Sequence, residues 1–194
     1  MKTAPRIMST LIAASVAALT LVAVPAASAG QLESGTFDDS GSETFDDCGF
    51  EVREDFRIYG KYSISKGTKQ TNGQFFRVKQ QATYHGTYTN VQTGAYFTSD
   101  WHTNFRELPA TIVDESGPVV TYQTKESGVW ETIRDETGAV RYRDTGNVVE
   151  QYVFDTLGDS QTGGEFISGE LVRTSGNFQS FQVDGCDIIN ELIG

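Results

Sequence analysis

Two histidines and one aspartate are the residues of this chain best suited to acid–base chemistry. His85 lies in "TYHGTY" and His102 in "SDWHTN", with Asp100 two residues before His102. An imidazole can gain or lose a proton near neutral pH, and a carboxylate on the same strand face could orient it. Pairing the two segments as a hairpin predicts His102 opposite Gln81, about 13 Å from His85. Because metal–nitrogen bonds are about 2 Å long, we expect no metal ion shared by the two histidines.

Glu54 is the second candidate for chemistry, because it falls on the apolar face of its predicted strand. Alternation along "VREDFRIY" puts Val52 and Phe56 on that same face. A carboxyl group facing an apolar interior needs a partner or acquires a raised pKa. Glu54, His102 and Asp100 together leave one alternative open, an enzyme at the mouth of a barrel. No Gly-x-Ser-x-Gly segment is present, and we assign no catalytic residue, cofactor or metal ligand.

Acidic residues precede glycines repeatedly between residues 114 and 149, with glycines at 117, 128, 138 and 146. The spacing is irregular and the acidic pattern of a calcium-binding EF-hand is absent, which argues against a repeat array and a calcium site. Glycine after Asp, Ser or Thr is typical of tight hairpin turns. We therefore interpret the pattern as turns between short strands.

The elements that must position these residues are predicted to be all-β. Short runs of β-branched and aromatic residues alternate with polar ones, and helical periodicity is confined to the last residues. The predicted fold is an antiparallel up-and-down meander of about eight to nine strands, closed into a barrel, with a short C-terminal helix starting at Asp184 or Asp187. The predicted strands are 51–65, 74–89, 95–108, 119–125, 129–134, 139–143, 147–155, 165–174 and 178–183.

Aromatic side chains provide a candidate binding wall. In the register that pairs Ala82 with Trp101, one face of the second hairpin carries large rings. A barrel of about eight strands is either filled by side chains or holds one small ligand. Trp130 would mark a partner surface if it faced solvent. The candidate ligand-binding residues are Phe76, Tyr84, Phe97, Trp101 and Phe105.

The N-terminal residues and the two cysteines suggest export. A basic start, an apolar stretch over 11–24 and the sequence Ala27-Ser28-Ala29 predict a secretory signal peptide over 1–29. Residues 30–44 are rich in Gly, Ser and acids and predict a flexible leader, followed by a single β-barrel domain over 45–194. The only cysteines, Cys48 and Cys186, are predicted to form a disulfide in an oxidising compartment.

The charge of the chain restricts its partners. It has 15 Lys and Arg against 26 Asp and Glu, a net charge of −11 that becomes −13 when the two basic residues of the signal are removed. Such a chain repels nucleic acid and, once the signal is cleaved, anionic membranes. We expect neither as a partner.

The segments "ETFDDCGF" and "GCDIINELIG", on either side of a central run of hairpins, resemble a set of uncharacterised small secreted actinobacterial proteins. The resemblance implies secretion and a β-barrel, lipocalin-like in layout only, and carries no catalytic residues. The leading expectation is a secreted barrel that binds a small apolar ligand. The alternatives are a structural or protein-interaction domain with a filled core, and the barrel-mouth enzyme.

Overall fold

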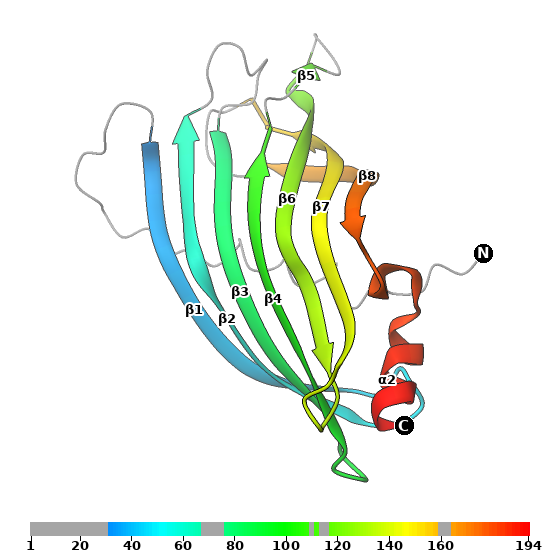
Figure 1. Cartoon of the computed structure of the whole chain (residues 1–194). Coiled ribbons are helices and arrows are strands. Elements are labelled where there is room, and N and C mark those ends of the chain that lie inside the picture. Colours follow the sequence, from blue (N-terminus) through cyan, green and yellow to red (C-terminus); the bar gives the residue numbers. More distant parts are fainter. Residues whose placement is uncertain (1–30, 67–75, 109–110, 113–116, 159–163) are drawn as a thin grey trace.

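The computed structural model describes residues 31–66, 76–108, 111–112, 117–158 and 164–194. They form one antiparallel sheet of seven long strands, with a 3-10 turn and a short helix after the last strand (Figure 1). The elements are β1 (Gln31–Phe45), β2 (Val52–Lys66), β3 (Phe76–Asn90), β4 (Tyr96–Glu107), β5 (Thr111–Ile112), β6 (Val119–Arg134), β7 (Val140–Asp155), β8 (Glu165–Asn177), η2 (Ser180–Gln182) and α2 (Gly185–Ile193).

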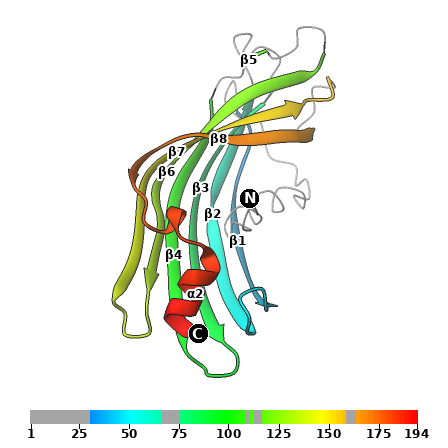
Figure 2. The same ribbon diagram turned by 90° about the vertical axis from the view of Figure 1, so that its right-hand side faces the viewer.

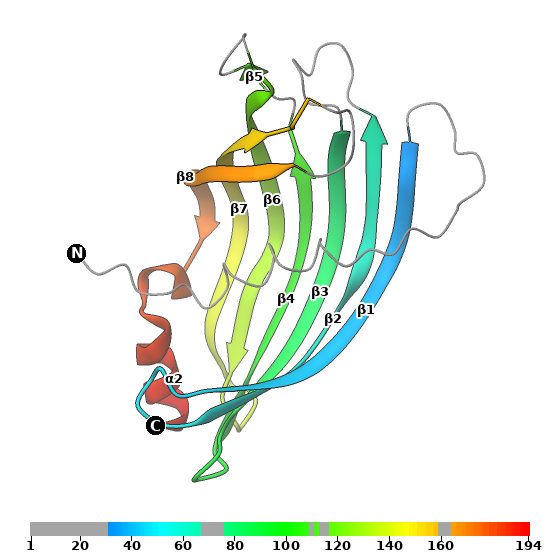
Figure 3. The same ribbon diagram turned by 180° about the vertical axis from the view of Figure 1, so that it is seen from behind.

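The predicted all-β meander is confirmed, but the predicted barrel is wrong because the sheet stays open. The strand order is β1-β2-β3-β4-β6-β7-β8, and the two-residue β5 pairs only with β6. β1 and β8 lie at opposite edges of a strongly curved sheet (Figures 1 and 3). The strand count differs from the expected eight to nine because two predicted hairpins do not exist. In addition, the predicted strand 178–183 contains the 3-10 turn η2 instead, and β1 is a strand that the sequence did not predict. The segments 119–134 and 140–155 are each one long strand.

The glycines expected in those two hairpins bend the sheet instead. Gly128 pairs with Gly146, and Gly146 pairs with Gly176 on β8. All three have positive φ angles of 148°, 145° and 136°, which side-chain-bearing residues rarely adopt. A Cβ on Gly128 would lie 2.2 Å from the carbonyl oxygen of His102. This row of glycines lets β6, β7 and β8 bend together, as glycine kinks do in curved sheets.

The prediction of a flexible leader over residues 30–44 is wrong, because residues 31–45 form the edge strand β1. Its glycines give room to rings of β2. A Cβ on Gly41 would lie 2.9 Å from the ring of Phe56, and one on Gly35 would lie 2.9 Å from Tyr62. The composition of the segment predicted disorder because composition contains no information about neighbouring strands. In the structure, the small residues make room for the rings of β2.

The hydrophobic core lies at one end of the concave face, under α2 (Figure 2). Ile188, Ile189 and Ile193 of α2 pack against Val52 and Phe97 of the sheet, and all five are buried.

The helix starts where expected and is held at both ends. The side chain of Asp184 caps it by accepting from the Cys186 amide at 2.8 Å. The Asn90 side-chain amide donates to the Ile193 carbonyl at 2.8 Å. The predicted disulfide joins Cys48 to Cys186 and links the loop before β2 to this helix.

Buried carboxyl groups gather on one face of the sheet, whereas the other face carries most of the Lys and Arg side chains of β2 to β6 together with Asp55 and Asp100. We call the face covered by α2 the inner face and the other the outer face. The strand registers assign Glu54, Glu107, Glu126, Glu131, Asp144 and Glu150 to the inner face. They assign Arg53, Arg57, Lys61, Lys79, Arg106 and Lys125 to the outer face.

The predicted signal peptide, residues 1–29, lies outside the described residues. Within the part of the chain that the structure describes, no helix has the length and apolar character needed to cross a bilayer.

Candidate functional site

A row of stacked rings crosses β2, β3 and β4 on the inner face. Tyr84 is paired with Trp101 across the strands, and the two rings are nearly parallel with centroids 5.5 Å apart. Phe56 stacks on the other side of Tyr84 at 6.4 Å. Tyr84 is buried, whereas Phe56 and Trp101 are half-buried. We call Phe56, Tyr84 and Trp101 the first aromatic row.

Glu54 lies beside this row as a buried carboxyl group with two phenol partners. Tyr84 and Tyr88 both donate to Glu54 Oε1, the latter at 2.9 Å. Burial raises the pKa of both tyrosines well above their usual range, and the nearby Glu54 adds to this effect. The need for a partner predicted for Glu54 is therefore met by hydroxyl groups, with the phenols remaining protonated.

A second aromatic cluster lies on β6, β7 and β8. Tyr122 contacts Tyr152 at 5.8 Å and Phe154 at 6.3 Å, and Tyr152 contacts Phe166 at 6.0 Å between ring centroids. We call these four residues the second aromatic cluster.

Three carboxyl groups lie between the two aromatic groups. Glu107 and Glu150 both pair with Thr124, on either side of β6, and Glu126 lies two residues further along the same face. Burial raises the pKa of Glu107 and of Glu126 to about 7. A hydrogen bond from Thr103 partly offsets the effect at Glu126, and the negative charge of Glu150 reinforces it.

A further carboxyl pair joins η2 to the sheet. Ser99 and Ser180 each donate to Glu131 at 2.9 Å, and Asp144 accepts from the Ser180 amide at 3.0 Å. Burial raises the pKa of Glu131, its two hydroxyl partners oppose this, and Asp144 adds repulsion. Because the Gln179 and Ser180 amides both donate to Asp144 and the Ser180 hydroxyl contacts both carboxyl groups, this pair anchors η2.

Of the five predicted ligand-binding residues, all lie on the inner face by register, but they do not form one wall. Tyr84 and Trp101 are in the first aromatic row, and Phe105 is half-buried opposite Glu126. Phe97 is buried in the core under α2, and Phe76 lies at the far end of β3, opposite Lys66.

The predicted register between β3 and β4 is wrong by two residues, although the faces are correct. Trp101 pairs with Tyr84 instead of Ala82, because the four-residue turn lies one position later than expected, with the Asn90 amide donating to the Ala95 carbonyl at 2.9 Å. His102 therefore lies opposite Thr83, and His85 opposite Asp100.

The shift also changes the contacts of the two histidines. His85 Nδ1 is hydrogen-bonded to Asp100 at 2.5 Å, and His102 Nδ1 to Thr83 at 2.7 Å. Asp100 thus orients His85 and not His102. The histidines are diagonal neighbours, about 7–8 Å apart instead of 13 Å. No three His, Cys, Asp or Glu residues of the described chain are grouped so as to hold a metal ion.

The residues proposed for a barrel-mouth enzyme do not converge. His102 and Asp100 are on the outer face, while Glu54 is buried on the inner face. On the outer face, Tyr59 contacts the other nitrogen of His85, with its hydroxyl 3.4 Å from His85 Nε2.

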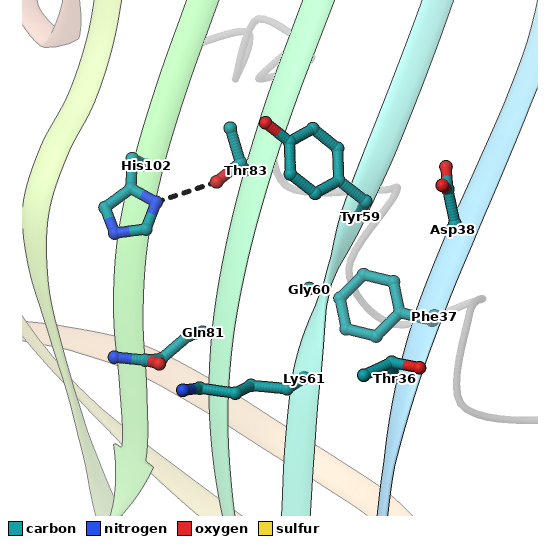
Figure 4. A pocket seen from close by; sticks show the side chains of 9 residues that line it. All are labelled: Thr36, Phe37, Asp38, Tyr59, Gly60, Lys61, Gln81, Thr83 and His102. Carbon is teal, nitrogen blue, oxygen red and sulfur yellow. Dashed lines mark hydrogen bonds between the residues drawn. The ribbon is translucent and has the colours of Figure 1, made fainter.

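The outer face contains two shallow depressions. The smaller, about 440 Å³, lies over β1 to β4 and is lined by Tyr59, Lys61, Gln81 and His102 among others (Figure 4). The larger, about 930 Å³, shares Lys61 and Gln81 with it and extends to β6.

Trp130 does not face solvent, so the condition under which it would mark a partner surface is not met. It is the extra residue of a bulge in β6, 8% exposed, and its ring packs against Phe178 and Phe181.

Sequence reasoning missed Tyr122, Glu126, Glu150 and Tyr152. The signal was available in "VVTYQTKE", where strict alternation puts Val120, Tyr122, Thr124 and Glu126 on one face. Gly128 and Gly146 resemble turn residues, so the sequence did not show that β6 and β7 continue through them as long neighbouring strands. No family model, no curated protein and no solved structure matches this chain.

Proposed function

We propose that this protein is a secreted binding protein whose inner face holds a small, largely apolar ligand that carries a cationic nitrogen. The site lies between the first aromatic row and the second aromatic cluster. The observation that carries the proposal is the position of Glu126 and Glu150 on the same face as both sets of rings.

Three physical points support this ligand class. Half-buried aromatic rings favour apolar groups, and their faces attract cations. A carboxyl group among such rings is costly to ionise unless a positive charge accompanies it. A bound cation would supply that charge and stabilise the ionised form of Glu126. The disulfide fits export to an oxidising compartment.

The test compares decyltrimethylammonium, decanol and decanoate below their micelle concentrations by isothermal titration calorimetry. These probes share a chain length and differ in head group. We expect the ammonium to bind at least tenfold more tightly than decanol and decanoate at pH 8. We also expect its affinity to fall at pH 5.5, where Glu126 is protonated.

Two glutamine variants sharpen the experiment. Glu126→Gln should weaken ammonium binding about tenfold, or about 1.4 kcal/mol, and leave decanol binding unchanged. Glu136→Gln, in the exposed turn between β6 and β7, is the matched control and should change neither. Equal binding of decanoate and the ammonium would contradict the proposed ligand class.

A second candidate function, self-association, is favoured by the edge strand β8. Every residue of β8 is exposed, including the apolar side chains of Phe166, Ile167, Leu171 and Val172. β8 pairs with β7 on one side only, and the open side of such an edge strand is a template for pairing with another chain.

The occupant that fits this edge is a second copy of the same strand. The sequence "EFISGELVR" is nearly symmetric about Gly169. An antiparallel pair of β8 strands centred there would match Phe166 with Val172, Ile167 with Leu171, and Glu165 with Arg173 of the second copy. Both apolar pairs and the ion pair would then form twice.

Charge exchange tests this pairing by sedimentation velocity. Glu165→Arg should shift the chain toward monomer by placing like charges opposite each other, and the double variant Glu165→Arg/Arg173→Glu should restore the dimer. A native chain that remains monomeric at high micromolar concentration would rule out this second candidate.

A further inference from the structure

Three positive side chains lie in a row across the outer face, in positions where they repel one another. Lys79 on β3 pairs directly with Arg106 on β4, and Arg106 pairs directly with Lys125 on β6. Side chains directly opposite in an antiparallel pair have Cβ atoms about 5 Å apart, and like charges there are destabilising. We call Lys79, Arg106 and Lys125 the basic row.

No carboxylate of the described residues forms an ion pair with a side chain of the basic row. The ion pairs within that part of the chain join Arg53 to Asp55, Arg57 to Asp38, His85 to Asp100, and Arg141 to Asp135 and Glu191. The chain as a whole has a net charge of −11, so a general excess of basic residues does not explain the row. The chain has 26 Asp and Glu residues, but none of those in the described strands is paired across the strands with a residue of the basic row.

The basic row also lies in a surface depression with hydrogen-bonding walls. The larger outer depression is lined by all three cations, by Lys61, and by polar side chains that include Ser63, Gln81, Asn104 and Ser127. It continues through Lys61 and Gln81 into the depression of Figure 4, where the ring of Tyr59 forms part of the wall and is itself stacked on His85, with ring centroids 5.9 Å apart. The combined groove runs across the strands, so it suits an extended ligand.

We propose that this groove binds an acidic polysaccharide, with anionic substituents on the basic row and sugar hydroxyls on the surrounding amides and hydroxyls. Neighbouring strands are about 4.8 Å apart, so the cations recur at steps comparable to the length of one sugar residue. Carboxylate and sulfate groups both meet this requirement, since Arg and Lys bind either. A bound polyanion would also neutralise the repulsion within the row. This site is independent of the inner-face ligand and lies on the opposite side of the sheet.

The experiment measures binding of the full chain to polygalacturonate, dextran sulfate and neutral dextran by calorimetry at several salt concentrations. We expect one or both acidic polymers to bind and neutral dextran not to bind. The logarithm of the affinity should fall with the logarithm of the salt concentration, with a slope of about −2 to −3 for three to four contacts. The two acidic polymers distinguish a carboxylate from a sulfate preference.

Two sets of variants distinguish binding by the basic row from attraction to positive charge anywhere on the outer face. Lys79→Gln/Arg106→Gln/Lys125→Gln should lower the affinity at least tenfold, and the single variant Arg106→Gln should lower it about threefold. The matched control Arg53→Gln/Arg57→Gln removes two outer-face cations that are already paired with Asp55 and Asp38, and should retain affinity. The triple variant should melt at the same or a higher temperature, because its substitutions relieve repulsion.

Three results would overturn the proposal. The first is unchanged affinity in both the triple and the single basic-row variants. The second is an equal loss in the control. The third is binding of inorganic polyphosphate or single-stranded DNA with the affinity of the acidic polysaccharides, which would indicate a surface selective for charge alone.

Discussion

Tyr84 and Trp101 lie directly opposite each other on β3 and β4, with their rings stacked at 5.5 Å. This contact fixes the register of the two strands and joins the hydroxyl network of Glu54 to the half-buried rings of the inner face. The inner face thus combines a dry core under α2 with an aromatic and acidic surface beyond it.

The hydroxyl of Tyr84 should matter more for stability than other tyrosine hydroxyls. Tyr84→Phe removes one of two donors to the buried Glu54 and should lower the free energy of unfolding by about 1–3 kcal/mol. Tyr142→Phe, which loses a bond to the solvent-exposed Glu191, is the control and should cost less than about 0.5 kcal/mol. Urea denaturation measures both, and equal losses would show that Glu54 does not depend on its phenol partners.

The glycine row should be intolerant of side chains. Gly128→Ala introduces a Cβ 2.2 Å from the His102 carbonyl at a φ of 148° and should cost more than about 3 kcal/mol. Gly138→Ala has a positive φ of 83° but no atom within 4 Å of its Cβ, so it should cost only about 1–2 kcal/mol. Thermal unfolding followed by circular dichroism compares them. Similar melting temperatures would mean that close approach between strands is unimportant.

Stability should decrease from pH 5 to pH 8 through the buried glutamates. The pKa of Glu126 is raised to about 7 from 4.5, so the folded state favours its protonated form. This contribution is complete below about pH 4.5 and is lost as pH rises through 7, at up to about 3 kcal/mol. Glu126→Gln should flatten the profile and raise stability at pH 8. An unchanged slope, with Glu136→Gln as the comparison, would assign the pH dependence to other groups.

The disulfide should hold α2 on the core. It links residues 138 positions apart, for which loop-closure entropy predicts about 4–5 kcal/mol. Replacing both Cys48 and Cys186 with Ser should lower the melting temperature and expose the amides of α2 to hydrogen exchange before those of β3 and β4. If all amides lost protection together, the helix and sheet would instead unfold as one unit.

The sequence by itself determined the local features of this protein. Alternation predicted β2, β3 and β4 with the correct faces. The start of α2 was predicted at Asp184 or Asp187, because a cap depends only on adjacent residues, and Asp184 is the cap. Two cysteines in a chain with export features predicted one bond. The apolar face around Tyr84 and Trp101 was also correct, since a strand places every second residue on one side.

Only the tertiary structure decided what depends on neighbouring strands. Gly128 resembles a turn residue in the sequence, and it is a strand residue because Gly146 lies opposite it. Segment 31–45 is ordered because β2 provides its partner. The row of Lys79, Arg106 and Lys125 joins three strands, and its members are far apart in the chain. Registers, bends and the opening of the sheet arise from packing between distant segments, and a local pattern contains no information about which segments meet.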